Sequence, residues 1–329
     1  MASYAVIGSN CFTGSHIIDT LLEDPSNSVI GFSRSPEKNA FYLPYKRHNS
    51  KNFRFIQVDL VRQSEQLVAL LDEFQPEYVI FVAALSEVET SNYHPLEYFN
   101  TNATGVIRLC QQLRSKSYLK KYIHISSAEV YGNCEKPLLE DAPLRPSTPY
   151  AVSKAAADLF LLTLHKNFGF PAVIMRFTNV YGRHQQLYKI IPRTIINLKK
   201  GVKTKLHGGG KAVKTWVHIR DIANAVEVTA KLGKIGGIYH FSDEHTYSVA
   251  DLVQRICELM GKDFEANIER VDERLGQDAQ YLLDYAKAET ELSWFPQVDF
   301  DPGLKETIRW IEDGWKEVEN DSLVYVHHA

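Results

Sequence analysis

The stretch Tyr122-Ile123-His124-Ile125-Ser126-Ser127-Ala128-Glu129-Val130-Tyr131-Gly132, continued after a proline-containing loop by Pro149-Tyr150-Ala151-Val152-Ser153-Lys154, indicates the fold most directly. Its apolar first half predicts a strand that runs into a loop. The second half predicts the start of a helix, because Ser147 and Thr148 can cap the free amides and proline fits the first helical turn. The alanine- and leucine-rich run that follows is expected to stay helical to Leu164.

Three residues of this stretch have the chemistry of a proton-transfer site. Tyr150 and Lys154 are four residues apart, so on a helix their side chains lie on one face. The Lys154 ammonium can then lower the pKa of the Tyr150 phenol from about 10 toward neutrality. Ser127, at the strand end, can hydrogen-bond the substrate oxygen whose proton Tyr150 takes. A solvated lysine near a half-buried tyrosine is also common, so the rest of the chain must support this interpretation.

The first residues predict a phosphate-binding turn. Ser3–Ile7 is a short apolar run, as expected for a parallel strand buried on both faces, and residues 8–16 lead from it into a helix. Such a turn places free backbone amides and the positive end of a helix together, which suits the pyrophosphate of a dinucleotide. The residues expected to contact the cofactor here are Gly8, Cys11, Phe12, Thr13 and Gly14.

Taken together, these motifs resemble the extended short-chain dehydrogenase/reductase superfamily, specifically its nucleotide-sugar epimerase/dehydratase branch. The family pattern Gly-x-x-Gly-x-x-Gly is matched at Gly8 and Gly14 and broken at Cys11. Either Cys11 narrows the approach of the phosphates, or the turn has a negative φ there and needs no glycine. The resemblance covers nearly the whole chain.

The resemblance implies an α/β fold: a doubly wound parallel sheet (Rossmann fold) with a smaller C-terminal substrate lobe. Residues 1–177 are expected to form the dinucleotide-binding domain, to which residues 215–245 return. Residues 178–214 and 246–329 are expected to form the nucleotide-sugar-binding lobe. Relatives pair as dimers through helices that here span about residues 95–115 and 149–165, so a homodimer is expected.

The cofactor is expected to be NADP in preference to NAD. The second predicted strand ends in Ser33-Arg34, where an NAD-binding unit usually offers a carboxylate to the adenosine ribose. Arg34 could bind a 2′-phosphate, although it could equally be a solvated loop cation. The resemblance assigns the other cofactor contacts to Asp59, Leu60, Ala83, Ala84, Tyr150 and Lys154.

The predicted substrate is a nucleotide-diphosphate sugar. The resemblance implies that Asn179 touches the sugar or diphosphate and that Lys214 replaces an arginine that grips the diphosphate. Residues 183–214 carry a local surplus of cations, although a charge run is usually a solvated face. The residues expected to bind the substrate are Ser86, Asn179, Lys189, Lys214 and Arg274.

Glu129 bears on the reaction type. In nucleotide-sugar 4,6-dehydratases a glutamate at this position removes the sugar C5 proton after oxidation at C4, and simple C4 epimerases usually lack it. The resemblance therefore favours an NAD(P)-dependent 4,6-dehydratase with Ser127, Glu129, Tyr150 and Lys154 as catalytic residues. Ala128 argues the other way, since dTDP-glucose enzymes have an acid there. Two other reactions stay open: C4 epimerisation and decarboxylation of the UDP-glucuronate type. Glu129 could also be a carboxylate at the rim of the site without a chemical role. A non-catalytic dinucleotide sensor is a remote alternative, because such proteins commonly lose the tyrosine or the lysine.

Composition excludes several other classes. The net charge of -3 gives no electrostatic footprint for nucleic acid or an anionic membrane, and no apolar run approaches the roughly 18 residues of a membrane span. Four scattered cysteines predict free thiols, as in a reducing cytoplasm. The first residues lack the basic and apolar regions of a signal peptide, so none is expected. Twelve histidines show no ligand spacing, so no metal is expected, and His124 is interpreted as a structural core residue.

Overall fold

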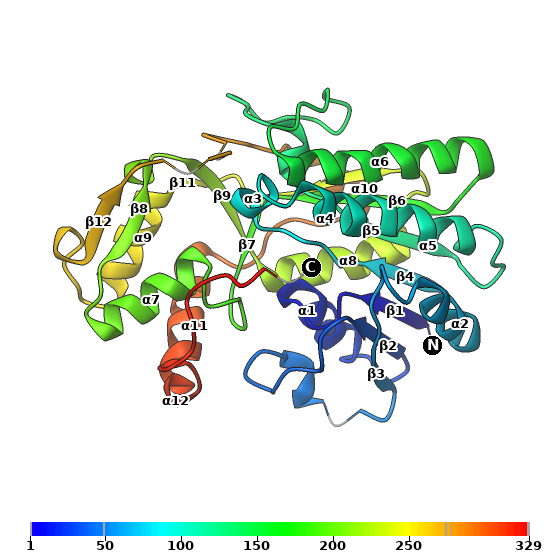
Figure 1. Ribbon diagram of the computed structural model, residues 1–329, viewed down its shortest axis with the longest axis horizontal. Coiled ribbons are helices and arrows are strands. Elements are labelled where there is room, and N and C mark those ends of the chain that lie inside the picture. Colours follow the sequence, from blue (N-terminus) through cyan, green and yellow to red (C-terminus); the bar gives the residue numbers. More distant parts are fainter. Residues whose placement is uncertain (1, 49, 274, 277, 328–329) are drawn as a thin grey trace.

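A seven-stranded parallel sheet with helices on both faces forms the centre of the computed structural model, which describes residues 2–48, 50–273, 275–276 and 278–327 (Figure 1). The strand order is β10-β6-β5-β4-β1-β2-β3. The chain builds outward from β1 through β2 and β3 and then returns to the other side of β1 with β4, which is the reversal of a doubly wound sheet. The predicted fold class is therefore confirmed. The strands are β1 (Ser3–Ile7), β2 (Ser28–Ser33), β3 (Phe53–Gln57), β4 (Tyr78–Phe81), β5 (Lys121–Ile125), β6 (Ala172–Phe177) and β10 (Ile238–Phe241).

Alternating side chains of the buried strands feed two cores. In β1, Tyr4 and Val6 belong to the core on one face, while Ala5 and Ile7 belong to the core on the other. The first face is covered by α1 (Phe12–Leu21), α8 (Ile219–Leu232) and α10 (Ala286–Leu292). The second is covered by α2 (Ser64–Phe74), α5 (Gly105–Leu113) and α6 (Pro149–Phe168). Because both faces are covered, the strands are continuous apolar runs, as the sequence predicted.

Helix α6 carries Tyr150 and Lys154 and is the longest helix among the described residues. Thr148 caps it as expected, since its side chain accepts a hydrogen bond from the Ala151 amide at 3.2 Å. The helix continues past the predicted end at Leu164 to Phe168. It stops there because Gly169 adopts a left-handed conformation with φ of 68°, which glycine tolerates and which terminates a helix.

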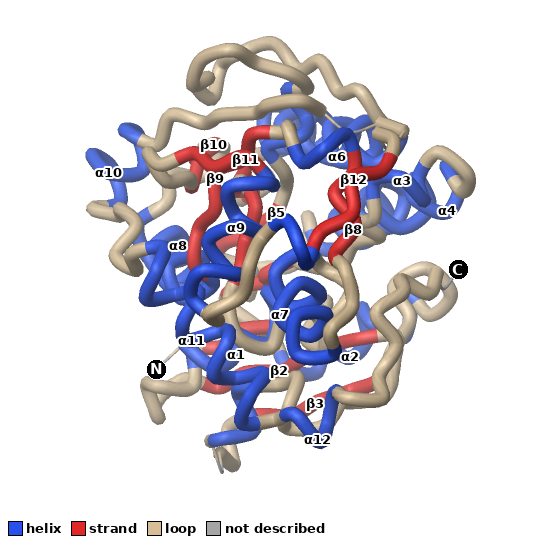
Figure 2. The backbone as a smooth tube through the Cα atoms, turned by 90° about the vertical axis from the view of Figure 1, so that its left-hand side faces the viewer, coloured by secondary structure: helices blue, strands red, loops and turns tan. Residues whose placement is uncertain are grey.

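A second group of elements lies at one end of the central sheet. The three-stranded sheet β11-β9-β7 and the pair β12-β8 surround a third apolar core, and Figure 2, which faces this end, shows β8 and β12 side by side. In the segment expected to return to the first domain, α8 packs on one face of the central sheet and β10 forms its edge strand. Strand β9 instead pairs with β7 and β11. The division into two functional domains stays a prediction. The elements are β7 (Asn179–Tyr181), α7 (Ile190–Lys200), β8 (Thr204–His207), β9 (Val213–His218), β11 (Thr246–Ser248), α9 (Val249–Leu259), β12 (Ile268–Val271), α11 (Phe300–Asp313) and α12 (Trp315–Val318).

A π-helical turn over Asn100–Thr104 joins α4 (Pro95–Phe99) to α5, after the short helix α3 (Val88–Ser91). Asn102 on this turn is fully buried. Its side chain accepts a hydrogen bond from the Leu85 amide and donates one to the Leu85 carbonyl, each at 2.9 Å, and donates a third to Ser153 Oγ at 3.0 Å. Asn102 therefore ties the loop after β4 to helix α6. None of the helices formed by the described residues is long and apolar enough to cross a membrane.

Candidate active site

The turn after β1 has the shape needed to approach a phosphate closely. Gly8 has a φ of 103°, and a Cβ there would lie 2.6 Å from the Ala83 amide nitrogen. A Cβ on Gly14 would lie 2.3 Å from the Gly8 carbonyl oxygen. Both positions therefore require glycine. Cys11 has a φ of -83° and caps α1, its Sγ accepting a hydrogen bond from the Gly14 amide at 3.2 Å, so the backbone needs no third glycine.

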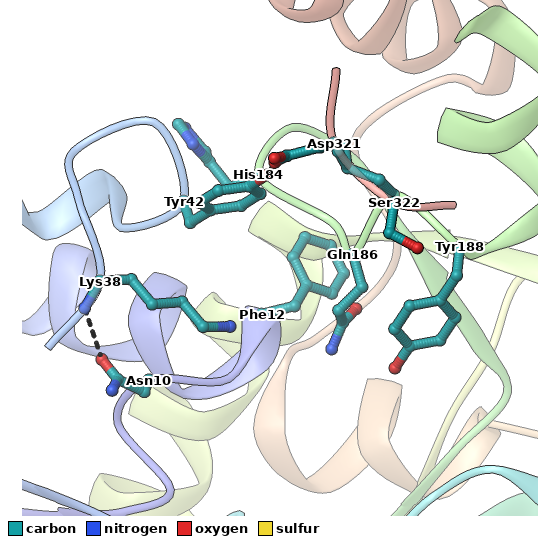
Figure 3. A pocket seen from close by; sticks show the side chains of 10 residues that line it. Asn10, Phe12, Lys38, Tyr42, His184, Gln186, Tyr188, Asp321 and Ser322 are labelled. Atoms are coloured by element: carbon teal, nitrogen blue, oxygen red, sulfur yellow. Dashed lines mark hydrogen bonds between the residues drawn. The ribbon is translucent and has the colours of Figure 1, made fainter. Parts of the chain in front are cut away.

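A cavity of about 170 Å³ opens beside this turn (Figure 3). Phe12, at the start of α1, lines it together with Asn10, and the Lys38 side chain points into it. Lys38 follows the end of β2 by five residues and is a cation that sequence reasoning missed, because no motif marks the loop that carries it. Thr13 is the next residue of α1. This glycine cradle, the helix start and the adjacent cation fit the phosphates of a dinucleotide.

The other residues expected to bind the cofactor have mixed environments. Ser33 Oγ accepts a hydrogen bond from the Asn10 amide at 3.3 Å, and Arg34 is exposed. Asp59 Oδ1 accepts hydrogen bonds from the backbone amides that follow it, at 2.7 and 3.0 Å, so this carboxylate holds its own turn. Leu60 is buried beside Gly105, the first residue of α5.

After β4, the predicted cofactor contacts Ala83 and Ala84 lie in the loop that leads to α3. The Ala83 amide donates a hydrogen bond to the Ile7 carbonyl at 2.8 Å, beside Gly8. Ala84 and Ser86 are exposed.

Ser127, Glu129 and Tyr150 meet beyond the carboxyl end of β5. Ser127 caps the short 3₁₀ helix Ala128–Tyr131, its hydroxyl accepting a hydrogen bond from the Glu129 amide at 3.2 Å. The Ser127 hydroxyl also interacts with the Tyr150 phenol and lowers its pKa, whereas the negative charge of Glu129 raises it. Tyr98 packs edge-on against Tyr150, with ring centroids 6.4 Å apart. Three of the four predicted catalytic residues, two from the segment after β5 and one from α6, are thus brought together.

The expected lowering of the Tyr150 pKa is wrong for this structure. Burial raises the pKa of the Tyr150 phenol above its usual value, and the negative charge of Glu129 adds to the effect. Lys154 does not offset this, because its ammonium donates to the Ile125 carbonyl at 2.6 Å and lies 3.4 Å from His124 Nε2. Burial also lowers the pKa of Lys154 to about 8, against the attraction of Asp158.

Lys154 is surrounded by a network of buried polar side chains. Asp158 on α6 pairs with Arg176 on β6 at 2.9 Å and accepts a hydrogen bond from Ser126 Oγ, also at 2.9 Å. Burial and the neighbouring cations Lys154 and Arg176 lower the pKa of His124 well below its usual value, so its imidazole is neutral. The network holds the Lys154 side chain at the end of β5.

Glu129 has the titration behaviour of a general base. Burial raises its pKa to about 7; the Lys214 cation opposes this effect, and the Asp278 carboxylate reinforces it. A carboxylate near half-ionisation at neutral pH can remove a proton that a neighbouring ketone has acidified.

Two of the residues expected to bind the substrate, Lys214 and Asn179, lie in the surroundings of Glu129. Lys214 on β9 donates a hydrogen bond to the Asp278 carbonyl at 2.8 Å, and its ammonium lies 3.9 Å from the centre of the Tyr281 ring. The Tyr281 hydroxyl donates to Asn179 Oδ1 at 3.0 Å. Asp278 and Tyr281 were missed as site residues; only their nearness to the expected clamp around residue 274 could have marked them.

Of the two remaining predicted substrate residues, the structure describes Lys189 only. Lys189 forms an ion pair with Glu87, in the loop after β4, and its side chain is about one-third exposed. Arg274 lies outside the described residues.

A doubly wound sheet with a glycine cradle after β1 and a serine, tyrosine and lysine at its carboxyl edge defines a dinucleotide-binding protein of the short-chain dehydrogenase/reductase class. The chain belongs to the GDP-mannose 4,6-dehydratase family, whose model matches residues 6–307. It is 31% identical to human dTDP-D-glucose 4,6-dehydratase over 325 residues, covering 95% of this chain and 92% of that protein. It is 28% identical to the dTDP-glucose 4,6-dehydratase of Haemophilus influenzae, covering 94% and 98%.

Other matches are longer or are known as structures. The chain is 29% identical to a trifunctional UDP-glucose 4,6-dehydratase of Arabidopsis thaliana that also carries epimerase and reductase activities, and spans about half (48%) of its length. The dTDP-glucose 4,6-dehydratase of Streptomyces venezuelae with NAD bound superposes with a TM-score of 0.88 at 30% identity, covering 95% of this chain and 98% of that one. The UDP-glucuronic acid 4-epimerase of Bacillus cereus gives 0.85 at 25%, covering 94% and 99%. The predicted family is confirmed.

Proposed function

We propose that the protein is a nicotinamide-dinucleotide-dependent 4,6-dehydratase that removes water from a nucleotide-diphosphate sugar through a 4-keto intermediate. The observation that carries the proposal is Glu129, a carboxyl with a pKa of about 7 placed beside Ser127 and Tyr150. The identities shared with dTDP-glucose 4,6-dehydratases support it. The glycine cradle after β1 supports the dinucleotide.

In the first step, Ser127 and Tyr150 hold the C4 hydroxyl and Tyr150 takes its proton. The chemistry that the bound dinucleotide supplies is acceptance of a hydride from C4 and its return to C6. Because burial raises the pKa of the Tyr150 phenol, the step requires positive charge near Tyr150. We expect Lys154 to provide it by turning its ammonium away from the Ile125 carbonyl, to which it donates here.

In the second step, Glu129 takes the C5 proton, whose acidity the 4-ketone has raised. The C6 hydroxyl then leaves as water and must gain a proton. Ala128 cannot donate one, so Glu129, now carrying the C5 proton, delivers it. When the hydride returns to C6, C5 must regain a proton, and this balances the proton that Tyr150 took from the C4 hydroxyl. This accounts for elimination with a single carboxyl beside Ser127. Lys214, next to Glu129, contributes positive charge that stabilises the ionised base before the step.

C4 epimerisation is the second candidate, because Ala128 leaves the position of a second acid empty and an epimerase shares the fold at 25% identity. In that reaction Glu129 has no chemical role. The two candidates therefore differ in what Glu129 does.

The decisive experiment incubates the purified protein with a panel of nucleotide sugars and follows product mass. Loss of one water supports dehydration, and an unchanged mass with altered C4 configuration supports epimerisation. The Glu129→Gln variant should stall with reduced nicotinamide bound and with no exchange at C5 in deuterated water. Glu312→Gln, an exposed carboxylate on α11, is the matched control. Conversion by Glu129→Gln at the parent rate removes Glu129 from the mechanism.

For the cofactor we propose NADP over NAD. The exposed Arg34 and the Lys38 ammonium in the cavity support binding of an extra phosphate, while the NAD in related structures speaks for the alternative. Denaturing the purified protein and identifying the released dinucleotide tests this proposal. Stoichiometric NAD would contradict it.

We place the nucleotide sugar between Lys214, Asn179, Lys189 and Ser86, whose positions around Glu129 and the loop after β4 support the assignment.

We also propose a homodimer that pairs through α4 and α6, supported by apolar side chains exposed there: Leu96, Val152, Leu159 and Phe168. A cytoplasmic location is supported by four free cysteines.

A further inference from the structure

The C-terminal segment, residues 321–327, crosses the groove where the cofactor is expected. Figure 1 shows this red segment running from α12 back toward the middle of the molecule. The Tyr42 hydroxyl donates a hydrogen bond to Asp321 Oδ2 at 2.5 Å, and Asp321 and Ser322 line the cavity beside Phe12 (Figure 3). Tyr325 then packs against Tyr188, with ring centroids 5.2 Å apart. We call residues 321–327 the strap.

The strap ends against α4 in a cluster of two imidazoles and a carboxylate. His327 Nε2 hydrogen-bonds one carboxylate oxygen of Glu97, and His94 Nδ1 lies 3.3 Å from the other. One ligand atom from each of the three residues lies within 4.8 Å of the others. The ring centroids of His94 and His327 are 4.4 Å apart. The cluster joins the start of α4 to a residue 230 positions later in the chain.

We propose that His94, Glu97 and His327 bind one divalent transition-metal ion of the zinc class, and that the ion fastens the strap over the dinucleotide groove. Two histidines and a glutamate are a ligand set that zinc accepts with three protein donors and one open position. Zinc ligands lie about 2 Å from the metal and so about 3.4 Å from one another. The three groups need to move by only about 1 Å, which their partly exposed side chains allow.

The surroundings of His327 suit a ligand. Its second ring nitrogen, Nδ1, lies 3.3 Å from the Tyr325 hydroxyl, which can accept the N–H of a metal-bound imidazole and fix the tautomer that presents Nε2. The ring also lies parallel to Tyr98, at 6.0 Å and 5°. His94 and Glu97 are three residues apart at the start of α4, so two of the three ligands are already positioned by one helical turn.

Fastening the strap has a consequence for cofactor exchange, and this part rests on the proposed dinucleotide site. Asp321 and Ser322 of the strap line the cavity of about 170 Å³ beside Phe12, so the strap covers part of the groove expected to hold the dinucleotide. We expect the strap to open when a dinucleotide enters or leaves. A metal ion that ties His327 to α4 stabilises the closed position, because binding is coupled to the ordering of the segment that carries the third ligand.

The site is tested by titrating the chelator-treated full-length protein with ZnCl₂ in a calorimeter and with CoCl₂ in a visible spectrometer. We expect one equivalent of zinc per chain and cobalt absorption bands of a tetrahedral site. His327→Ala and His94→Ala should each weaken binding by at least about tenfold. His245→Ala removes an exposed histidine that pairs with Asp243 and should leave binding unchanged. Absence of saturable one-to-one binding, or equal loss in the His245 control, overturns the site.

The fastening role has its own readout, which does not depend on turnover. The release rate of bound dinucleotide is measured by nicotinamide fluorescence, with zinc or with chelator. We expect zinc to slow release several-fold in the parent protein and to have no effect in His327→Ala. Zinc binding with an unchanged release rate overturns the fastening role. Failure of the dehydratase assignment, by contrast, would appear in product mass and leave the zinc titration unaffected.

Discussion

Replacing Glu129 with glutamine should make the protein more stable at alkaline pH while it abolishes dehydration. The pKa of Glu129 is about 7 in the folded protein, against an ordinary value of 4.5. A folded-state pKa above the unfolded one means that stability is fully present below pH 4.5 and falls as the pH rises through 7, because the folded protein then holds a charge in a place that disfavours it.

The size of the effect follows from the same two values. Each unit of pKa difference corresponds to about 1.4 kcal/mol, so the ionised carboxylate lowers the free energy of unfolding by roughly 3 kcal/mol at pH 8.5 and by less than about 1 kcal/mol at pH 5. Glutamine resembles the neutral carboxyl in shape and carries no charge at either pH. The variant should therefore gain roughly 2 to 3 kcal/mol relative to the parent between pH 5 and pH 8.5.

The assay is thermal unfolding of both proteins without cofactor, at one protein concentration, at pH 5 and pH 8.5. The unfolding midpoint of Glu129→Gln should exceed that of the parent by several degrees at pH 8.5 and by little at pH 5. Glu312→Gln, on the exposed face of α11, should show no such pH-dependent gain. A difference between Glu129→Gln and the parent that is the same at both pH values would refute the reasoning, because it would mean that Glu129 does not titrate between them.

Three further changes test other parts of the site and surface. Tyr150→Phe should lower turnover by roughly 10²- to 10⁴-fold with an unchanged far-ultraviolet spectrum, because only the proton acceptor is removed; a variant keeping a tenth of the parent rate would exclude Tyr150 from proton transfer. Lys154 has a pKa of about 8 in the folded protein and 10.5 ordinarily, so between these pH values the unfolded chain binds more protons than the folded one. The free energy of unfolding of the parent, measured in urea, should therefore rise from pH 8 to pH 10. Lys154→Met should lose that gain, and an identical pH profile would contradict the assignment. Leu159→Glu places a charge on an apolar side chain that is 55% exposed on α6 and should convert a dimer to monomers in sedimentation experiments, unless the protein pairs through another face.

The sequence predicted the central sheet well because its strands are buried on both faces and therefore stand out as apolar runs between turns. β1 has the bounds expected from such a run. The sequence could not predict that β9 lies outside the central sheet, because its pairing with β7 depends on contacts between segments far apart in the chain. Helix α6 was predicted to end at Leu164, but it continues for four more residues until Gly169 stops it.

For the site, spacing predicted which residues meet but not what their surroundings do to them. Ser127 and Tyr150 meet as expected, yet the pKa of Tyr150 is raised because burial, which spacing does not reveal, outweighs the charge of a lysine turned toward Ile125. The cluster at Glu97 escaped notice for a related reason. Its third member, His327, is brought in by the path of the whole chain, so a search for ligand spacing within one segment could not find it.

The π turn at Asn100–Thr104 holds one residue more than an α-helical stretch that turns through the same angle. Deleting one residue there would let the turn close into a regular α-helix, so the apolar side chains of α5 that face the sheet, such as Leu109, would keep their places in the core. The same deletion inside α5 would rotate the rest of that helix by about 100°, since an α-helix has 3.6 residues per turn. What the deletion in the π turn removes is the widened turn from which Asn102 reaches Leu85 and Ser153. It would therefore release the loop that borders the site while the helix behind it keeps its register.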